Sequence, residues 1–342
     1  MYLVTGGAGF FGELLVKRLL SFGHKVTSFD LNKPHFEHSS LRVIQGDIRD
    51  QKCIEDALEG VTTVFHNVAQ VPVAKNKSLF WSVNRDGTEI LLKACLKMSI
   101  KRVVYTSSSA VFGVPLLNPV TVSTIPLPKE AYGKAKLAGE SLCREYILKG
   151  LSCSIIRPRT VLGVGRLGIF QILFEWIYQG KNIPVLGRGD NMYQFVHGDD
   201  LASACIAAGE ARYGGIYNIG TDRFGTMREV LESLVTHADT GSKVVSVPAS
   251  LAEFGMNITS ATGLSPLGSY HSLMYGKSMF FDTEESKLSL GFQPQYSNNE
   301  MFIDTYDWYC RHRAEIISGS LAGSKHQSAI KQGLLKIVPF FL

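Results

Sequence analysis

The stretch that decides the fold reads Thr5-Gly6-Gly7-Ala8-Gly9-Phe10-Phe11-Gly12. The four residues before it, Met1 to Val4, can form the first strand of a parallel sheet. After it, residues 13–20 place apolar side chains at the spacing of a helix. The glycines are therefore expected on a turn that leads from a strand into a helix.

Three of these glycines suit a turn that holds a dinucleotide. Gly6, Gly9 and Gly12 allow the backbone to turn tightly, to approach a pyrophosphate and to pack the helix on the sheet. The helix N-terminus, at Phe10 and Phe11, supplies free N–H groups and the positive end of the helix dipole. A glycine-rich turn that binds nothing is the alternative.

An acidic residue strengthens the dinucleotide interpretation. A second predicted strand, residues 24–29, leads directly to Asp30, about where a carboxylate holds the hydroxyls of an adenosine ribose. The carboxylate of Asp30 would repel a 2′-phosphate, and no arginine follows it directly. We therefore expect the cofactor to be NAD rather than NADP.

The composition is that of an ordinary globular enzyme. The chain has 342 residues, of which 45% are hydrophobic and 19% are charged, and this length supports one large domain or two moderate ones. Its net charge of +5 is scattered along the sequence, so no nucleic-acid partner is expected. The six cysteines form no CxxC pair, which indicates neither a disulfide framework nor a metal site.

Nothing in the sequence predicts secretion or a membrane span. The first predicted strand begins at residue 1, which leaves no room for a signal peptide. No run of 18 uninterrupted apolar residues is found. A reduced, cytoplasmic setting is therefore expected.

Strands and helices alternate along the first half of the chain. Residues 41–46 read as a third strand, residues 52–58 as a helix and residues 61–65 as a fourth strand. This rhythm predicts an α/β fold, a Rossmann-type doubly wound parallel sheet. Cofactor contacts are expected beyond the carboxyl ends of its strands, from Asp47, Ile48, Asn67, Val68, Ala69 and Thr106. Asp47 can accept a hydrogen bond from the adenine amine or cap the next helix, and both roles stay open.

A tyrosine and a lysine four residues apart supply the expected chemistry. Tyr132 and Lys136 fall in a helix-forming stretch, so the phenol and the ammonium group share one helical face. The cation is expected to favour the phenolate and lower the pKa of Tyr132, which would make it a general base. A predicted strand at residues 102–105 runs into three serines, and Ser108 can hydrogen-bond the reacting oxygen.

Together these features resemble the extended short-chain dehydrogenase/reductase family, part of the NAD-dependent epimerase/dehydratase superfamily. The likeness rests on the glycine turn, Asp30, Asp47, the serine stretch and Tyr132-x-x-x-Lys136, and it covers roughly residues 1–310. By this resemblance Ser108 matches the catalytic serine and Tyr132 the proton-transferring base. Lys136 matches the residue that lowers the pKa of that base and binds the nicotinamide ribose.

Further expectations come from the resemblance alone. Asn84, in Val-Asn-x-x-Gly-Thr, matches the asparagine that supports the proton relay, and Arg157-Pro158 matches a pair placed near the nicotinamide. His197 is expected to be structural, because the tyrosine and lysine already fill the role of the base. A homodimer built on the helices at residues 82–96 and 132–146 is also implied.

The chain is expected to divide into three parts. Residues 1–160 form the predicted NAD-binding domain, to which a segment at about residues 190–220 returns. Residues 161–189 and 221–312 are assigned to substrate binding. Residues 313–342 are expected to form a linker and an amphipathic tail.

The substrate side departs from the sugar-nucleotide enzymes of the resembled family. Those enzymes usually place an arginine four residues before the return histidine, where this chain has Tyr193. They place a second basic group just before Phe281, where this chain has only Lys277. Diphosphate recognition favours arginine, so a nucleotide-sugar 4-epimerase with tightly bound NAD becomes the alternative. A dehydratase is disfavoured, because Ser107 and Ser108 replace the acidic pair of such enzymes.

A lipophilic substrate is favoured instead. Residues 254–276 carry no Asp, Glu, Lys or Arg and are rich in Met, Leu, Tyr and Phe, as in a pocket for an apolar ligand or the core of a small domain. With the insertion at residues 75–80, the chain looks most like the 3β-hydroxysteroid dehydrogenase and sterol-4-carboxylate 3-dehydrogenase branch. This implies oxidation of a sterol-like alcohol, with loss of carbon dioxide from a 4-carboxylate. A protein that binds NAD without catalysis is disfavoured by the intact Ser108, Tyr132 and Lys136.

The last residues predict an amphipathic helix. Ile330, Leu334, Ile337 and Phe341 fall on one face, opposite two lysines. Such a helix can lie on a membrane surface, a peripheral contact that would suit a lipid substrate. It can equally dock on the protein itself or on a second subunit.

Overall fold

A parallel sheet forms the centre of the larger lobe. The computed structural model describes residues 1–70, 77–248 and 276–319. The strands of the central sheet are β1 (Tyr2–Thr5), β2 (Val26–Asp30), β3 (Leu41–Gln45), β4 (Thr63–His66), β5 (Arg102–Thr106), β6 (Cys153–Pro158) and β11 (Ile216–Ile219). They pair in the order β11-β6-β5-β4-β1-β2-β3, every pair parallel, which confirms the predicted doubly wound α/β fold.

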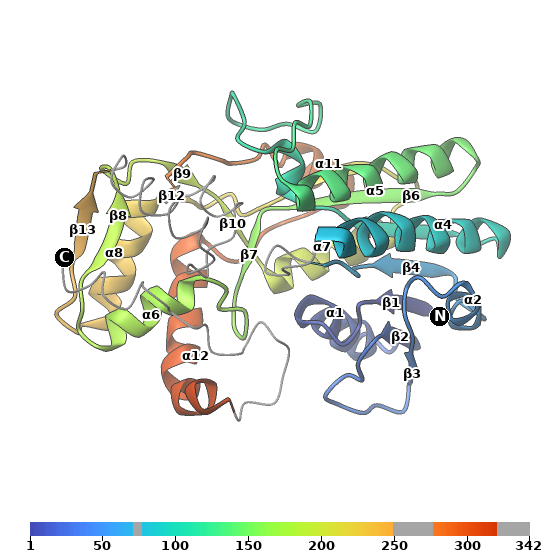
Figure 1. The fold of residues 1–342 in the computed structure, drawn as a ribbon, viewed down its shortest axis with the longest axis horizontal. Coiled ribbons are helices and arrows are strands. Elements are labelled where there is room, and N and C mark those ends of the chain that lie inside the picture. The colour runs from blue at the N-terminus through green and yellow to red at the C-terminus, as the bar shows by residue number, and fades with distance from the viewer. Residues whose placement is uncertain (71–76, 249–275, 320–342) are drawn as a thin grey trace.

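Helices cover both faces of this sheet (Figure 1). One face carries α2 (Gln51–Ala57), α4 (Thr88–Lys97) and α5 (Ala131–Leu148), and the other carries α1 (Phe10–Ser21), α7 (Gly198–Glu210) and α11 (Glu284–Leu290). Neighbouring residues of one strand serve opposite cores, because side chains alternate across a strand. Val103 of β5 packs in the first core and Val104 in the second.

The helix expected at residues 82–96 differs from the prediction. A short helix, α3 (Lys77–Trp81), leads into a π-helical turn, η1 (Ser82–Gly87), and only then does α4 begin. The last residue of the π-helical turn must be small, since a Cβ on Gly87 would lie 2.6 Å from Cγ2 of Ile48. Apolar spacing does not separate a π-helical turn from an α-helix, so the sequence did not predict it.

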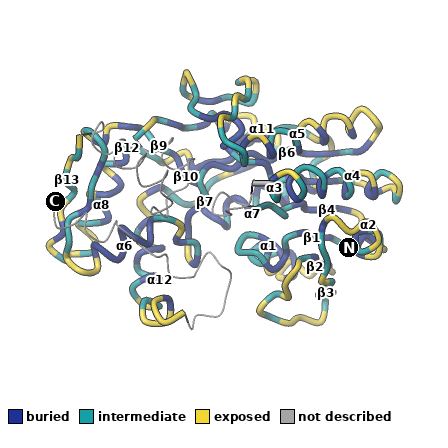
Figure 2. The backbone as a smooth tube through the Cα atoms, in the orientation of Figure 1, coloured by how far each residue is buried: buried dark blue, intermediate teal, exposed yellow. Residues whose placement is uncertain are grey.

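The smaller lobe is built around a second, aromatic core. It comprises α6 (Phe170–Tyr178), β8 (Ile183–Leu186), α8 (Met227–Ala238), β13 (Val244–Val247) and α12 (Asn298–Ser318), with β8 and β13 paired in parallel. The rings of Phe170 and Phe302 meet edge to face, with their centroids 4.9 Å apart. Figure 2 shows buried residues running through both lobes.

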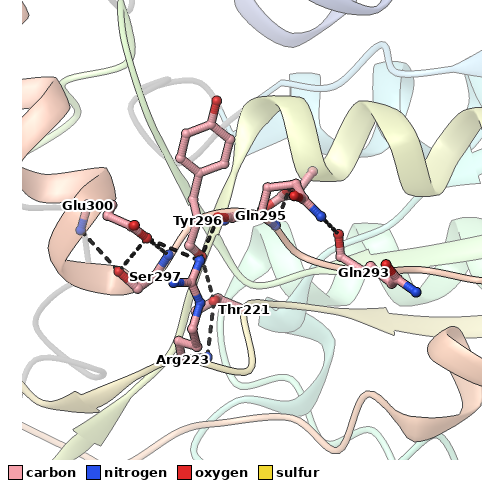
Figure 3. Close-up of polar contacts among 8 residues, drawn as sticks. Thr221, Arg223, Gln293, Gln295, Tyr296, Ser297 and Glu300 are labelled. Carbon is pink, nitrogen blue, oxygen red and sulfur yellow. Dashed lines mark hydrogen bonds and ion pairs between the residues drawn. The ribbon is translucent and has the colours of Figure 1, made fainter.

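Short strand pairs and a polar cluster connect the lobes. β7 (Thr160–Leu162) pairs with β10 (Phe195–His197), and β9 (Met192–Tyr193) pairs with β12 (Gly225–Thr226). The cluster in Figure 3 fixes the chain that enters α12: Thr221 Oγ1 donates to the Tyr296 carbonyl at 2.6 Å, and Arg223 Nη2 donates to the Gln295 carbonyl. The start of α12 is thus fastened to the end of β11.

Two of the predicted boundaries need correction. The linker expected from residue 313 is helical up to Ser318, because Arg313 forms a double hydrogen bond with Glu175 of α6 and holds the end of α12 in the smaller lobe. Within the segment 221–312, α11 packs against β11 and α7 of the larger lobe rather than with the substrate region. The division into domains otherwise stays a prediction.

Several predictions concern residues outside those described. They are part of the insertion at residues 75–80, the apolar stretch at residues 254–275 and the amphipathic tail from residue 320. Among the described residues, no helix is both long and apolar enough to cross a membrane.

Candidate active site

The glycine turn joins β1 to α1 as expected. Gly6 adopts a φ of +72°, which favours glycine, and a Cβ on Gly12 would overlap the carbonyl oxygen of Gly6. Gly9 is the N-cap of α1 and offers no side chain to the first-turn N–H groups, which include those of Phe10 and Phe11. This turn therefore fits the pyrophosphate of a dinucleotide.

Asp30 lies beside this turn, at the end of β2. Its carboxylate accepts hydrogen bonds from the backbone N–H of Ala8 at 3.3 Å and of Asn32 at 3.0 Å. Both carboxylate oxygens have further lone pairs, so the group can still accept from ribose hydroxyls. Its contact with the adenosine ribose stays a prediction.

Asp47 is held by a neighbour rather than used as a helix cap. Arg49 donates to its carboxylate through Nε at 2.9 Å and through Nη2, and these hydrogen bonds hold the pKa of Asp47 below its usual value. The N-cap of α2 is Asp50, so the capping role left open for Asp47 is wrong. Ile48, also predicted to contact the cofactor, is buried beneath Gly87.

The ends of β4 and β5 meet at an unpartnered donor. Thr106 Oγ1 donates to Asn67 Oδ1 at 2.6 Å, and among the described residues the buried Nδ2 of Asn67 has no acceptor. The backbone at Asn67 and Val68 lies against Gly6, about 3 Å from where a Cβ would be. Ala69, which follows them, is half-buried. A buried amide without an acceptor beside the glycine turn fits a cofactor that supplies one.

Ser108 and Tyr132 come together at the carboxyl end of β5. Glu130 caps α5 by accepting from the backbone N–H of Tyr132 at 2.7 Å and of Gly133 at 2.6 Å. This cap fixes the start of α5, and with it the position of Tyr132 in the first turn of the helix. Ser108 opens a short helix, η2 (Ser109–Phe112), and its side chain accepts from the N–H of Ala110 at 3.1 Å. The Ser108 hydroxyl lies close enough to the Tyr132 phenol to lower the pKa of that phenol.

The pKa of Tyr132 departs from the sequence expectation. Burial raises this pKa, while the hydrogen bond from Ser108 and the charge of Arg166 lower it, and the net direction is upward. Lys136 instead donates its Nζ to the Thr106 carbonyl at 2.8 Å, and burial lowers its own pKa to about 8. The expected lowering of the Tyr132 pKa by Lys136 is therefore not seen, because the ammonium group is directed to the end of β5.

Arg166 is a site residue that the sequence did not predict. Its Nε donates to the Val161 carbonyl at 3.2 Å, and its guanidinium carbon lies 5.5 Å from the ring centroid of Phe10. It therefore lies beside Phe10 of α1, and its charge also acts on Tyr132. Its only sequence signal is a position in the glycine-rich segment after β7, which carries no recognisable spacing.

Asn84 positions the loop that follows β4. Its buried amide accepts from the N–H of Gln70 at 2.7 Å and donates to the carbonyl of the same residue at 3.1 Å. Both the oxygen and the nitrogen of the Asn84 amide therefore have a hydrogen-bond partner. Asn84 lies in the π-helical turn, and such turns are common at functional sites. Its part in a proton relay stays a prediction.

Arg157 is bound inside the fold, which corrects its predicted contact with the cofactor. Its guanidinium makes two hydrogen bonds to Glu140 of α5, at 2.8 and 2.7 Å, and a third to the Val122 carbonyl. Ser107 donates to the same carboxylate at 2.7 Å. The Arg157 side chain therefore holds β6, α5 and the serine stretch together, and Pro158 ends β6 in a buried position.

His197 takes part in the packing around α7, and its expected structural role stays a prediction. Its Nδ1 accepts from the N–H of Asp199 at 3.2 Å and so caps α7, while its ring stacks on Tyr296 at a centroid distance of 3.8 Å. Burial lowers its pKa. All six cysteines are free thiols, and the described residues contain no group of three or more His, Cys, Asp or Glu side chains placed to hold a metal.

Comparisons with known proteins show which family the chain is similar to. Residues 2–220 match the model of the NAD dependent epimerase/dehydratase family. An uncharacterized protein of Sinorhizobium fredii is 54% identical over 341 residues, 99% of this chain and 86% of that protein.

Two further similar proteins have names that refer to different small molecules. The mouse sterol-4-alpha-carboxylate 3-dehydrogenase, decarboxylating, is 30% identical over 230 residues, 64% of this chain and 63% of the mouse enzyme. The solved structure of MoeE5 in complex with UDP-glucose and NAD is 26% identical, has a TM-score of 0.73 and covers 91% of this chain and 99% of that one.

Proposed function

The chain belongs to the NAD-dependent epimerase/dehydratase family, and from this we propose that it interconverts a secondary alcohol and a ketone on a bulky, sterol-like substrate. As a member of this family it is an NAD-dependent enzyme. The proposal for the substrate is of the sterol-4-carboxylate 3-dehydrogenase type and rests on the similarity to the mouse enzyme.

One observation carries the proposed reaction: the Ser108 hydroxyl is close enough to the Tyr132 phenol to lower its pKa, and Lys136 stands one helical turn further along α5. The phenolate form of such a tyrosine, beside a hydroxyl that holds the same oxygen, can remove a proton from an alcohol bound next to both groups. These groups lie at the carboxyl edge of the sheet that also carries the glycine turn. The site therefore suits proton removal from an alcohol beside a bound dinucleotide.

We assign each residue a separate task. Bound NAD would accept a hydride from the carbon that carries the alcohol. Tyr132 would take the hydroxyl proton, and Ser108 would hold the same oxygen in place. Lys136, whose Nζ is held by a hydrogen bond to the Thr106 carbonyl, would bind the nicotinamide ribose. A carboxylate β to the new ketone can then leave as carbon dioxide without a further base, because the ketone accepts the electrons.

The remaining cofactor contacts follow from the geometry of the strand ends. The turn at Gly6, Gly9 and Gly12 would hold the pyrophosphate, and Asp30 the adenosine ribose. Nδ2 of Asn67, which has no acceptor among the described residues, would donate to the part of the cofactor that lies between the glycine turn and Ser108. Asp47, oriented by Arg49, keeps its proposed contact with the adenine amine.

A nucleotide-sugar 4-epimerase is the second candidate. The likeness to MoeE5 in complex with UDP-glucose and NAD extends over nearly the whole of that chain, both lobes included, and so favours it. The same tyrosine and serine would then act in both directions on one sugar carbon. Against it, the chain has Tyr193 where an arginine is expected.

The test is NADH formation with two substrate sets. We expect NADH when the enzyme and NAD meet a 3β-hydroxysterol, and also carbon dioxide when that sterol carries a 4-carboxylate. UDP- and dTDP-hexoses form the second set, with product analysis of each mixture. An inverted hexose without net NADH would replace the first candidate by the second, and no conversion of either set would contradict both.

The charge of Arg166 predicts a pH effect. Because this cation favours the Tyr132 phenolate, Arg166→Met should raise the pKa of Tyr132 and so reduce kcat for alcohol oxidation about tenfold at pH 7. The loss should shrink as the pH is raised, since the phenolate then forms without the cation. A kcat profile over pH checks this, with Arg188→Met, an 89% exposed arginine, as the control. A loss that is equal at every pH would show that Arg166 acts otherwise.

A homodimer, contact of the tail with a membrane surface and a cytoplasmic location stay predictions. Sedimentation of the purified chain, alone and with lipid vesicles, addresses the first two.

A further inference from the structure

Arg159, directly after β6, is a buried arginine without a polar partner. Its side chain is 1% exposed. Among the described residues, Nε, Nη1 and Nη2 all lack a hydrogen-bond acceptor, and no carboxylate pairs with them. A guanidinium is charged at every pH that proteins tolerate, so this buried cation has no counter-charge within the part of the chain that the structure describes.

Arg157, two residues earlier, shows what a structural arginine looks like in the same place. It is equally buried at 1%, yet each of its three side-chain nitrogens donates a hydrogen bond, two of them to Glu140 and one to the Val122 carbonyl. The two arginines are only two residues apart, and among the described residues only Arg157 meets a carboxylate. The fold therefore supplies a carboxylate to Arg157, whereas the guanidinium of Arg159 is available to an anion from outside the described residues.

Aromatic rings hold Arg159 in position. Its guanidinium carbon lies 4.7 Å from the ring centroid of Tyr193 and 5.6 Å from that of Phe281. Tyr193 is itself fixed, since its hydroxyl is 3.1 Å from Thr160 Oγ1 and its carbonyl accepts from Asn298 Nδ2 at 2.7 Å. Rings contact the π face of a guanidinium and leave its N–H edge to an oxyanion. The arginine is thus oriented before any anion binds.

The sheet order places Arg159 on the substrate side of the site. The glycine turn follows β1, Ser108 follows β5, and Arg159 follows β6, the next strand outward in the order β1-β4-β5-β6. Thr106 of β5 is level with Ile156 of β6, so Ser108 and Arg159 leave the same edge of the sheet within one residue of each other. The dinucleotide turn lies on one side of the serine and Arg159 on the other.

We propose that Arg159 binds an oxyanion of the substrate, a carboxylate or a phosphate, at the end of the site away from the glycine turn. This proposal adds a substrate class to the proposed function. The reaction of that substrate rests on the proposed function, whereas its binding to Arg159 does not. A guanidinium edge matches either group with two parallel hydrogen bonds. The chain has Tyr193 where the sugar-nucleotide enzymes usually have an arginine. The guanidinium of Arg159, which follows β6, lies against the ring of this tyrosine. The enzyme would therefore select acidic substrates.

The kinetic test compares matched substrates that differ in the anion. Arg159→Met, which keeps the length of the stem and removes the charge, should raise KM for a 4-carboxysterol about 10- to 100-fold. KM for the corresponding sterol without the carboxylate should change less than twofold. Arg188→Met, at an exposed site, should leave both values unchanged. An equal change with both sterols would overturn the proposal.

A binding test is independent of turnover, so it stands even if no sterol or hexose is converted. With NAD present, calorimetry would follow UDP and, in detergent micelles, a 4-carboxysterol. UDP binding that Arg159→Met abolishes would assign the anion to a diphosphate, and the same result with the carboxysterol would assign it to a carboxylate. Binding that survives Arg159→Met, or no binding of either probe to the wild type, would overturn the proposal.

Thermal unfolding separates this role from a structural one. Removing an unpaired buried charge should not lower the Tm of Arg159→Met, whereas Arg157→Met, which takes from Glu140 its buried cation, should lower the Tm clearly. If Arg159→Met does not fold, Arg159→Lys takes its place, because it keeps the charge and loses the planar fork. A fall in the Tm of Arg159→Met like that of Arg157→Met would make Arg159 structural.

Discussion

Tyr132→Phe should reduce kcat at least about 1000-fold while the protein still binds NAD. The substitution removes one oxygen from a half-buried side chain, so the backbone of α5 and the Glu130 cap stay as they are. Without the phenol, no group at Ser108 can take the alcohol proton, and proton transfer of this kind contributes about 100- to 10,000-fold to a rate. NADH formation and NAD affinity, measured on one preparation, check both parts.

A second tyrosine supplies the control. Tyr213 is 70% exposed and distant in sequence from the proposed site, so Tyr213→Phe should behave as the wild type. Raising the pH should not restore Tyr132→Phe, in contrast to Arg166→Met. Turnover within tenfold of the wild type would remove Tyr132 from the mechanism, and binding of NAD without turnover in the wild type would favour a non-catalytic role for the whole chain.

Glu140→Ala should lower the free energy of unfolding by about 3–5 kcal/mol, the usual cost of breaking a buried ion pair by removing one partner. Glu140 is fully buried and accepts from Arg157, Arg144 and Ser107. Its loss leaves the buried guanidinium of Arg157 without a carboxylate. Denaturant unfolding monitored by circular dichroism gives the difference.

Two further variants serve as controls for the loss of stability in Glu140→Ala. Glu145→Ala, on the same helix, removes an exposed pair with Lys149 and should cost less than about 1 kcal/mol. The double variant Glu140→Met with Arg157→Met should regain much of the loss, because the unpaired charge is gone. If Glu140→Ala cost no more than Glu145→Ala, the buried pair would not stabilise the fold.

The sequence predicted what is written in local patterns. The turn at Gly6 to Gly12, the end of β2 at Asp30 and the helix that carries Tyr132 each depend on a few consecutive residues, and the structure has them in the expected places. The meeting of Ser108 with Tyr132 also follows, since both stand at the carboxyl edge of one parallel sheet.

What the sequence missed depends on contacts between distant segments. Arg157 and Arg159 look alike in the sequence, and only the position of Glu140 on α5 shows that one is paired and the other is not. The direction of the Lys136 amine was missed for the same reason, because the Thr106 carbonyl that accepts from it belongs to another element. Sequence spacing fixes the face of a helix but not what the opposite element offers to it.

The order of the strands also sets a timetable for synthesis. β1 to β5 are adjacent to one another in the sheet, so the dinucleotide half can pair as soon as residue 106 has left the ribosome. The smaller lobe cannot close its core until α12 arrives, and the polar cluster at Thr221 and Arg223 can receive that helix only then. The nascent enzyme therefore acquires its cofactor half first and exposes the apolar faces of α6 and α8 to chaperones until the last described helix is made.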